Sequence, residues 1–339
     1  MRRLCRVGVF VAAVIAAGAG LQAATSYRAI KQIPIGGEGG WDYVTVDAAA
    51  HRLYVSHATK VVVVDIDSGT VVGEIPDTPG VHGFAVAADL GRGFTSNGRT
   101  NTSTIVDLKT LKALGSVSTG GNPDAIHYEP TRHEVYTMNG TGKSATVFAA
   151  ATGQVVATIP LGGKPEAVVQ DDAARRLYVN LEDAAAIAVI DITTHELVAT
   201  WPLRGCEEPT GLGLDPKNHR LFSACANKVM AVTDSGSGTA VTSIPIGAGA
   251  DGAAYDAATG LAFASNGADG TVTIAHLDSP STLTVVQTLK TAVSGRTMIL
   301  NPVTHEIFVP AADTAPNPAR QNRPAPVPNS FKVLMFGPQ

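Results

Sequence analysis

Residues 133–139 read HEVYTMN, with Tyr136 at the centre of a short run of β-forming residues. Six other stretches carry an aromatic in the same setting: HRLYVSH from residue 51, GRGFTSN from 91, RRLYVNL from 175, HRLFSAC from 219, GLAFASN from 260 and HEIFVPA from 305. The seven aromatics, Tyr54, Phe94, Tyr136, Tyr178, Phe222, Phe263 and Phe308, are 40, 42, 42, 44, 41 and 45 residues apart. A four-stranded propeller blade repeats with this period, so the sequence predicts an all-β fold, a seven-bladed β-propeller.

Each unit of the repeat contains four short runs rich in Val, Ile and Thr and bounded by Gly, Pro or Asp, a composition typical of strands joined by turns. The first unit shows the order: DYVTVD from residue 42, the aromatic strand, KVVVVDID from residue 60 and TVVGEIP from residue 70. Several runs are apolar throughout, as expected for sheets that neighbouring blades cover on both faces. We therefore expect four-stranded blades.

The two ends of the chain predict how the ring closes. IPIGG from residue 33 resembles IPLGG from residue 159, which belongs to a fourth strand. The last unit ends with SFKVLMF from residue 330 and lacks a fourth strand of its own. The N-terminal strand should therefore complete the last blade, which removes exposed sheet edges that invite aggregation.

The repeat resembles the YVTN-repeat β-propellers, also called the YncE-like family, over essentially the whole mature chain. The signature strand appears as YTMN at 136–139, YVSH at 54–57 and FASN at 263–266, whereas FSAC and FVPA replace it in units five and seven. The resemblance implies the propeller fold but no single activity, because function depends on the site and not on the fold.

The first residues have the composition of a secretory signal. Arg2, Arg3 and Arg6 precede or begin an apolar run that extends from Val7 to Ala19, and small residues follow. We expect a signal peptide over residues 1–23 and a mature single domain over 24–339, located in the periplasm or secreted. The alternative is an uncleaved anchor helix, which the short apolar run disfavours. No other segment is long and apolar enough to span a membrane.

Loss of those three arginines lowers the 25 basic residues to 22, against 29 acidic ones, so the mature chain has a net charge of −7. Nucleic-acid binding usually needs a basic surface, and the charge disfavours such a partner. We expect a monomer that binds a small ligand or a protein. Cys206 and Cys225 remain after export and should form a disulfide, because the repeat places both on one face of the fifth blade.

Residues that recur at one position of the repeat should serve the fold. His51, His133, His219 and His305 each lie three residues before a repeat aromatic, so we assign them to a turn. Asp65, Asp107, Asp191 and Asp234 recur where third strands end, and a carboxylate there can accept hydrogen bonds from the backbone of the next turn.

Residues that differ between units are the candidates for function. Twelve residues before each aromatic lie Asp42, His82, Asp124, Glu166, Thr210, Asp251 and Arg296. These positions start the innermost strands, which ring the mouth of a propeller's central channel. We predict a ligand site there, formed by the six ionisable members; the alternative is a solvated mouth whose charges pair with one another.

Two more histidines extend this prediction to a metal. His57 ends the second strand of unit one, and His127 lies three residues beyond Asp124. A set of His57, His82, Asp124, His127 and Glu166 would suit one divalent ion, calcium if oxygen ligands dominate and zinc if imidazoles take part. No other cofactor is expected.

The loop over residues 312–329 is long and Pro-rich for a connection within a blade. Loops of this length are usually functional or disordered. It is either a semi-rigid lid over the mouth or a surface insertion.

No catalytic motif is present: the chain lacks GxSxG, HExxH, CxxCH and a phosphate-binding loop. This favours a binding or scaffold module over an enzyme, and no residue is predicted to be catalytic. The alternative is a metal-dependent hydrolase, similar to propeller lactonases or esterases, that uses the mouth carboxylates. An electron-transfer or quinone-dependent dehydrogenase is disfavoured by the missing haem motif.

Overall fold

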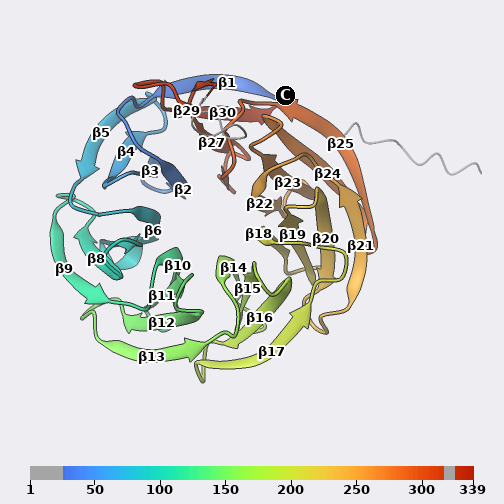
Figure 1. Cartoon of the computed structure of the whole chain (residues 1–339), viewed down its shortest axis with the longest axis horizontal. Coiled ribbons are helices and arrows are strands. Elements are labelled where there is room, and N and C mark those ends of the chain that lie inside the picture. Colours follow the sequence, from blue (N-terminus) through green and yellow to red (C-terminus); the bar gives the residue numbers. More distant parts are fainter. Residues whose placement is uncertain (1–25, 317–324) are drawn as a thin grey trace, which may run out of the picture.

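The computed structural model describes residues 26–316 and 325–339 and shows seven antiparallel sheets of four strands arranged radially around a central axis (Figure 1). The predicted seven-bladed propeller is confirmed. In each blade the first strand lies nearest the axis and the fourth lies at the rim. The predicted signal peptide, residues 1–23, lies outside the described residues, as do residues 317–324 of the long loop.

The strands follow the chain blade by blade. Blades one and two contain β2 (Trp41–Asp47), β3 (Arg52–His57), β4 (Lys60–Asp65), β5 (Thr70–Ile75), then β6 (Val81–Ala87), β7 (Arg92–Asn97), β8 (Thr102–Asp107) and β9 (Ala113–Ser118), with a 3-10 turn at Ala88–Leu90. Blades three and four contain β10 (Pro123–Glu129), β11 (Glu134–Asn139), β12 (Ser144–Ala149), β13 (Val155–Pro160), then β14 (Pro165–Asp171), β15 (Arg176–Leu181), β16 (Ala186–Asp191) and β17 (Glu196–Pro202).

Blades five and six contain β18 (Pro209–Asp215), β19 (Arg220–Cys225), β20 (Val229–Asp234), β21 (Ala240–Pro245), then β22 (Ala250–Asp256), β23 (Leu261–Asn266), β24 (Thr271–Ser279) and β25 (Thr282–Lys290). Blade seven contains β26 (Ile299–Leu300), β27 (Ile307–Ala311), β30 (Lys332–Pro338) and β1 (Tyr27–Pro34), and the loop between β27 and β30 forms a small hairpin of β28 (Thr314–Ala315) and β29 (Ala325–Pro326).

The hydrophobic core lies between adjacent blades. The seven repeat aromatics are at most 2% exposed and pack against the next sheet. Their burial explains the period found in the sequence, because each blade needs one large side chain at the same depth to fill the space against its neighbour. Fourth strands are largely exposed: β5 and β13 each contain one buried residue and β17 contains none, as expected for strands at the solvent-facing rim.

The ring closes as predicted. β1 is antiparallel to β30, from Tyr27 opposite Pro338 to Pro34 opposite Lys332. On β1, Ile33 is fully buried and Tyr27 is 2% exposed, whereas Ile30 faces solvent at 46%. The last blade is therefore built from both ends of the chain.

The recurring histidines occupy the turn between the first and second strands, as predicted. His51, His133, His219 and His305 have φ between 52° and 61°, and the residues that replace them in the other blades, Gly91, Arg175 and Gly260, are also left-handed. The recurring aspartates also have the predicted role: Asp107, for example, accepts hydrogen bonds from the backbone N–H groups of Lys109 (3.1 Å) and Thr110 (2.7 Å).

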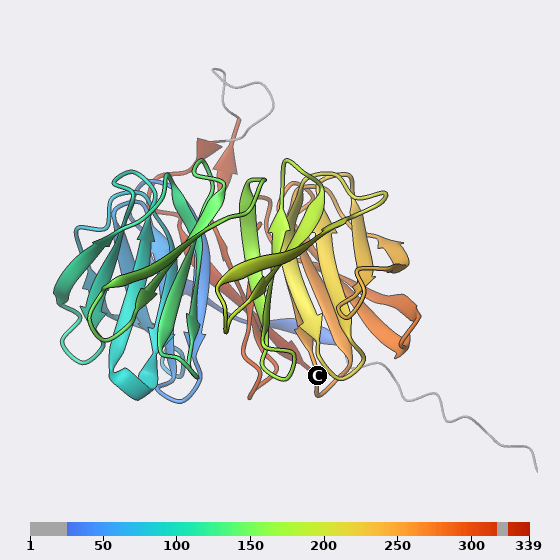
Figure 2. The same ribbon diagram turned by 90° about the horizontal axis from the view of Figure 1, so that it is seen from below.

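The faces of the propeller differ in their loops. We call the face on which first strands begin the mouth face. The hairpin of β28 and β29 rises from it (Figure 2). On the same face a disulfide joins Cys206 to Cys225, with Cα atoms 5.5 Å apart, which confirms the predicted pair. Within residues 26–316 and 325–339, no helix is long and apolar enough to cross a membrane.

Candidate functional site

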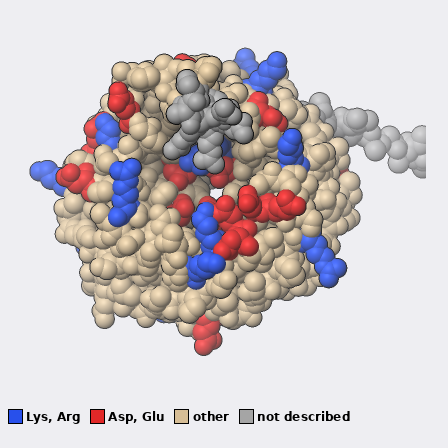
Figure 3. All heavy atoms as spheres, in the orientation of Figure 1, with Lys and Arg blue, Asp and Glu red and all other residues tan. Residues whose placement is uncertain are grey.

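The predicted mouth residues, which lie twelve positions before each repeat aromatic, do surround the opening of the central channel. In six blades they occupy the second position of the first strand, and in blade seven Arg296 precedes β26. Figure 3 shows acidic and basic side chains gathered around the central opening on the mouth face. The ligand role predicted for them remains a prediction, but their convergence is a property of the structure.

A β-bulge at the start of each complete first strand explains this convergence. The pairing with the second strand shifts register between Trp41 and Val44, and shifts equivalently at the start of β6, β10, β14, β18 and β22. Bulges re-aim side chains and are common beside functional sites. In blade two the Ser96 hydroxyl accepts the hydrogen bond of the Gly83 N–H at 2.8 Å and bonds the Asp124 carbonyl of the next blade, which fixes the loosened strand.

Arg296 anchors one side of the mouth. Its guanidinium lies 2.6 Å from the Asp251 carboxylate and 3.6 Å from Asp42, and it donates a hydrogen bond of 3.0 Å to the Trp41 carbonyl. Arg296 is therefore engaged by blades six and one. It is not a free anion receptor.

His82 links the carboxylates of blades one and three. Its Nδ1 lies 2.6 Å from Asp42 and 3.6 Å from Asp124. Burial opposes a charge on this imidazole, but the hydrogen bond to Asp42 and the nearby carboxylates outweigh it and raise the pKa of His82 to about 9. One ligand atom from each of these three residues lies within 4.8 Å of the others, a spacing that could hold a metal ion.

Asp124 and Glu166 form the most strongly perturbed part of the mouth. They are only 7% and 8% exposed. Burial and repulsion by Asp42 raise the pKa of Asp124 to about 7, although His82 and Lys164 oppose the rise. Burial and repulsion by Asp124 raise the pKa of Glu166 to about 9, although Lys164 lies 2.7 Å away. These carboxyl groups are ionised only at a free-energy penalty.

The charged mouth, as we define it, comprises Asp42, His82, Asp124, Lys164, Glu166, Glu182, Asp251 and Arg296. The network begins with Asp251 in blade six and continues through Arg296, Asp42, His82 and Asp124 in blades seven, one, two and three. It ends in blade four, where Lys164 pairs with both Glu166 and Glu182. Blade five interrupts it, because the Thr210 hydroxyl donates to the Ala250 carbonyl at 3.0 Å. Five acidic groups face three basic ones, so the mouth has a formal charge of −2 when all eight are ionised.

The other predicted metal ligands lie elsewhere. His57 is 1% exposed, with its ring 4.4 Å from that of Phe331, and neither ring nitrogen has a hydrogen-bond partner among the described residues. His127 lies deeper in the channel, where its Nε2 is 2.5 Å from the Gln170 side-chain oxygen. Neither joins the cluster of Asp42, His82 and Asp124, and Glu166 acts on that cluster only through its charge, which repels Asp124 and favours protonated His82.

Two members of the charged mouth, Lys164 and Glu182, were not among the sequence candidates. Glu182 directly follows a second strand, and the equivalent residue in every other blade is glycine or alanine: Ala58, Gly98, Gly140, Ala226, Gly267 and Ala312. The same comparison between blades that selected the other mouth residues would therefore have selected Glu182. Lys164 lies two residues before Glu166 and has no comparable signal.

Comparison with known proteins identifies the fold alone. No family model matches the sequence, and no curated protein matches it. The structure is similar to hydrazine synthase of Kuenenia stuttgartiensis, with a TM-score of 0.70, 15% identity and coverage of 88% of this chain and 97% of that one. It is also similar to the RRP9 WD40 repeats (TM-score 0.75, 12% identity, 93% and 99% covered) and to U3-55K (TM-score 0.75, 12% identity, 90% and 98% covered). At these identities the chain is a seven-bladed β-propeller similar to WD40 domains, and the likeness indicates nothing about activity.

Proposed function

We propose that the chain is an exported propeller of the YVTN-repeat type that acts as a binding module, and that the charged mouth recognises a cationic group on a small molecule or a protein. The observation that carries this proposal is the Asp124–Glu166 pair. Two nearly buried carboxyl groups repel each other there, with pKa values of about 7 and about 9. A cation placed between them would relieve that repulsion, and perturbed groups of this kind cluster at functional sites.

The proposal predicts that cations stabilise the folded protein and that anions do not. Thermal unfolding with putrescine should give a higher Tm than thermal unfolding with succinate, a dianion of similar size, because only the diamine binds the folded state. The shift should be larger at pH 8 than at pH 6, because Asp124, with a pKa of about 7, is mostly protonated at the lower pH. Equal shifts with the two ions, or a larger shift at pH 6, would contradict a cation site at the mouth.

The second candidate function is a metal-dependent hydrolase, and the convergence of Asp42, His82 and Asp124 within 4.8 Å favours it. Two carboxylates and one imidazole suit zinc, or calcium with more oxygen ligands. A divalent ion there would polarise the carbonyl of an ester or lactone. His82 would first have to release its proton, so metal affinity should rise with pH.

Elemental mass spectrometry of protein purified without chelator tests this candidate. About one zinc or calcium per chain is expected, and His82→Ala should lose it while His276→Ala, at an exposed histidine beside Asp278, should keep it. Metal-dependent cleavage of an ester or lactone that ceases with chelator would then support hydrolysis. Absence of stoichiometric metal in the wild-type protein would eliminate the hydrolase.

A further inference from the structure

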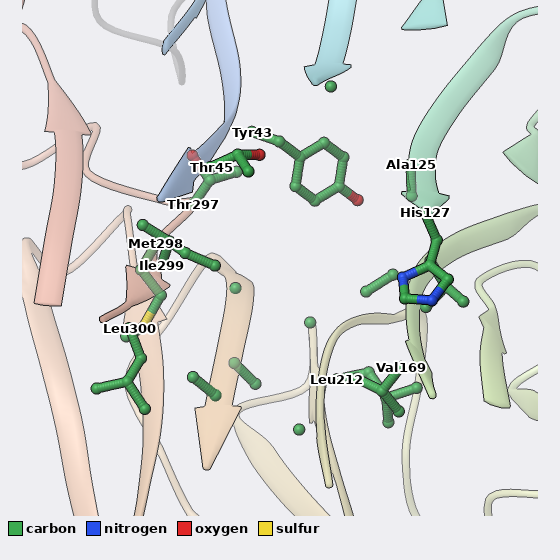
Figure 4. A pocket seen from close by; sticks show the side chains of 18 of the residues that line it. Tyr43, Thr45, Ala125, His127, Val169, Leu212, Thr297, Met298, Ile299 and Leu300 are labelled. Atoms are coloured by element: carbon green, nitrogen blue, oxygen red, sulfur yellow. The ribbon is translucent and has the colours of Figure 1, made fainter. Parts of the chain in front are cut away.

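On the inner side of the charged mouth, the first strands enclose a chamber of about 590 Å³ (Figure 4). Its wall is mainly apolar, with Val169, Leu212, Met298, Ile299 and Leu300 among the residues that line it. It extends as far as Pro216 and Pro302, which follow the ends of β18 and β26. The chamber therefore reaches the face opposite the mouth, and its volume falls in the range of small-molecule sites.

Tyr43 lies at the end of this chamber that is nearer the charged mouth, directly after Asp42 on β2. Its ring projects from β2 into the cavity, towards the strand that carries Ala125 and His127 (Figure 4). It packs against the core cluster of blades three and four, together with Val168. The equivalent residue in the other blades is small: Gly83, Ala125, Ala167, Gly211, Gly252 and Thr297. One large side chain among six small ones therefore stands between the charged mouth and the apolar chamber.

The polar side chains of the wall have partners within the protein, and the one carboxylate, Asp251, is paired with Arg296 of the charged mouth. The Thr45 hydroxyl donates to the Phe84 carbonyl at 2.6 Å, and the Thr297 hydroxyl donates to the Asp42 carbonyl at 2.8 Å. His127 and Gln170 pair with each other. The Tyr43 hydroxyl, by contrast, has no hydrogen-bond partner among the described residues. Water in the chamber therefore finds few partners, and a ligand that displaces poorly held water gains affinity.

We propose that this chamber is a second binding site, which takes a neutral, largely hydrocarbon or aromatic molecule with one hydroxyl or carbonyl group. At about 30 Å³ for each water molecule, the chamber has the volume of roughly twenty waters, which limits the ligand to that size. The single polar group would pair with the Tyr43 hydroxyl. A charged ligand is disfavoured because the apolar wall cannot compensate for its lost hydration. The site adjoins the cation site proposed for the mouth, since Asp251 also lines the chamber, but it takes a ligand of a different class.

Titration with N-phenyl-1-naphthylamine, a neutral probe that fluoresces in apolar surroundings, tests the proposal. The wild-type protein should bind it saturably at one site. Val169→Trp places a large side chain in the chamber and should weaken binding at least tenfold. Val156→Trp makes the same change at a position 46% exposed on the outer strand β13 and should bind as the wild type does. A melting curve for each variant verifies the fold.

Ala254→Leu fills the same chamber by a smaller amount and serves if Val169→Trp does not fold. Asp124→Asn, which alters only the mouth, should keep its affinity for the probe, so failure of the cation site and failure of the chamber give different results. Absence of saturable binding, or unchanged affinity in folded Val169→Trp or Ala254→Leu, would overturn the proposal.

Discussion

Asp124→Asn should make the ligand-free protein more stable at pH 8 and should remove most of its affinity for cations. The native pKa of Asp124, about 7, is above the usual value of 3.8 because the group is buried beside other carboxylates. Such a group stabilises the fold fully below the unfolded pKa, and this contribution is lost as pH rises through the native pKa. The difference between 3.8 and about 7 corresponds to at most about 4 kcal/mol, and rearrangement of the neighbouring carboxylates should reduce the gain to about 1–3 kcal/mol.

Denaturant unfolding at pH 4.5 and pH 8 measures this effect. The variant should exceed the wild type at pH 8 and lose most of that advantage at pH 4.5, where Asp124 is protonated in the native state. Asp67→Asn, at a carboxylate whose side chain is 71% exposed, is the matched control and should change little at either pH.

The binding half of this prediction is measured with putrescine at pH 8. Apart from burial, the Asp124 charge is the largest cause of the raised pKa of Glu166. In the variant Glu166 therefore ionises more readily, but the cation meets one carboxylate of the pair instead of two. A loss of affinity of at least tenfold is expected. A variant that is both less stable than the wild type at pH 8 and equally able to bind putrescine would show that Asp124 serves the fold.

Ile33→Asp should prevent the propeller from closing. Ile33 is fully buried where blade seven packs against blade one, and a carboxylate there would have no charged partner and would lose its hydration. We expect the free energy of unfolding to fall by more than about 4 kcal/mol, which is beyond the range of ordinary substitutions. Without β1, the strand β30 becomes an exposed edge and should promote aggregation.

Ile30→Asp is the control on the same strand, because Ile30 is 46% exposed and its substitution removes little buried surface. Size-exclusion chromatography and thermal unfolding of the two variants give the comparison. If Ile33→Asp remained a monomer with the melting temperature of Ile30→Asp, the N-terminal strand would not hold the ring together.

The repeat was predictable because one large aromatic in each blade meets the same packing requirement. The mouth residues were predictable because they differ at a position where the backbone is the same in every blade. Comparison at that single position overlooked Glu182 and Tyr43, each of which differs from small residues at another shared position. His57 was placed on the correct face, but the sequence could not show that Phe331, at the end of the long loop, would cover it.

The pairing of β1 with β30 also governs the order of events in folding. Tyr27 finds its partner only when Pro338 has been synthesised, so the first strand of the described chain is the last to gain a neighbour. Pairings so distant along the chain are slow to form because their loop-closure entropy is lost before any contact is gained. The backbone N–H of Gln339 donates to the carbonyl of Ser26 at 2.8 Å, so the two ends could be joined directly. A circular permutant that joins these residues and opens between two other blades would turn the slowest contact into a local one and should fold faster to the same ring.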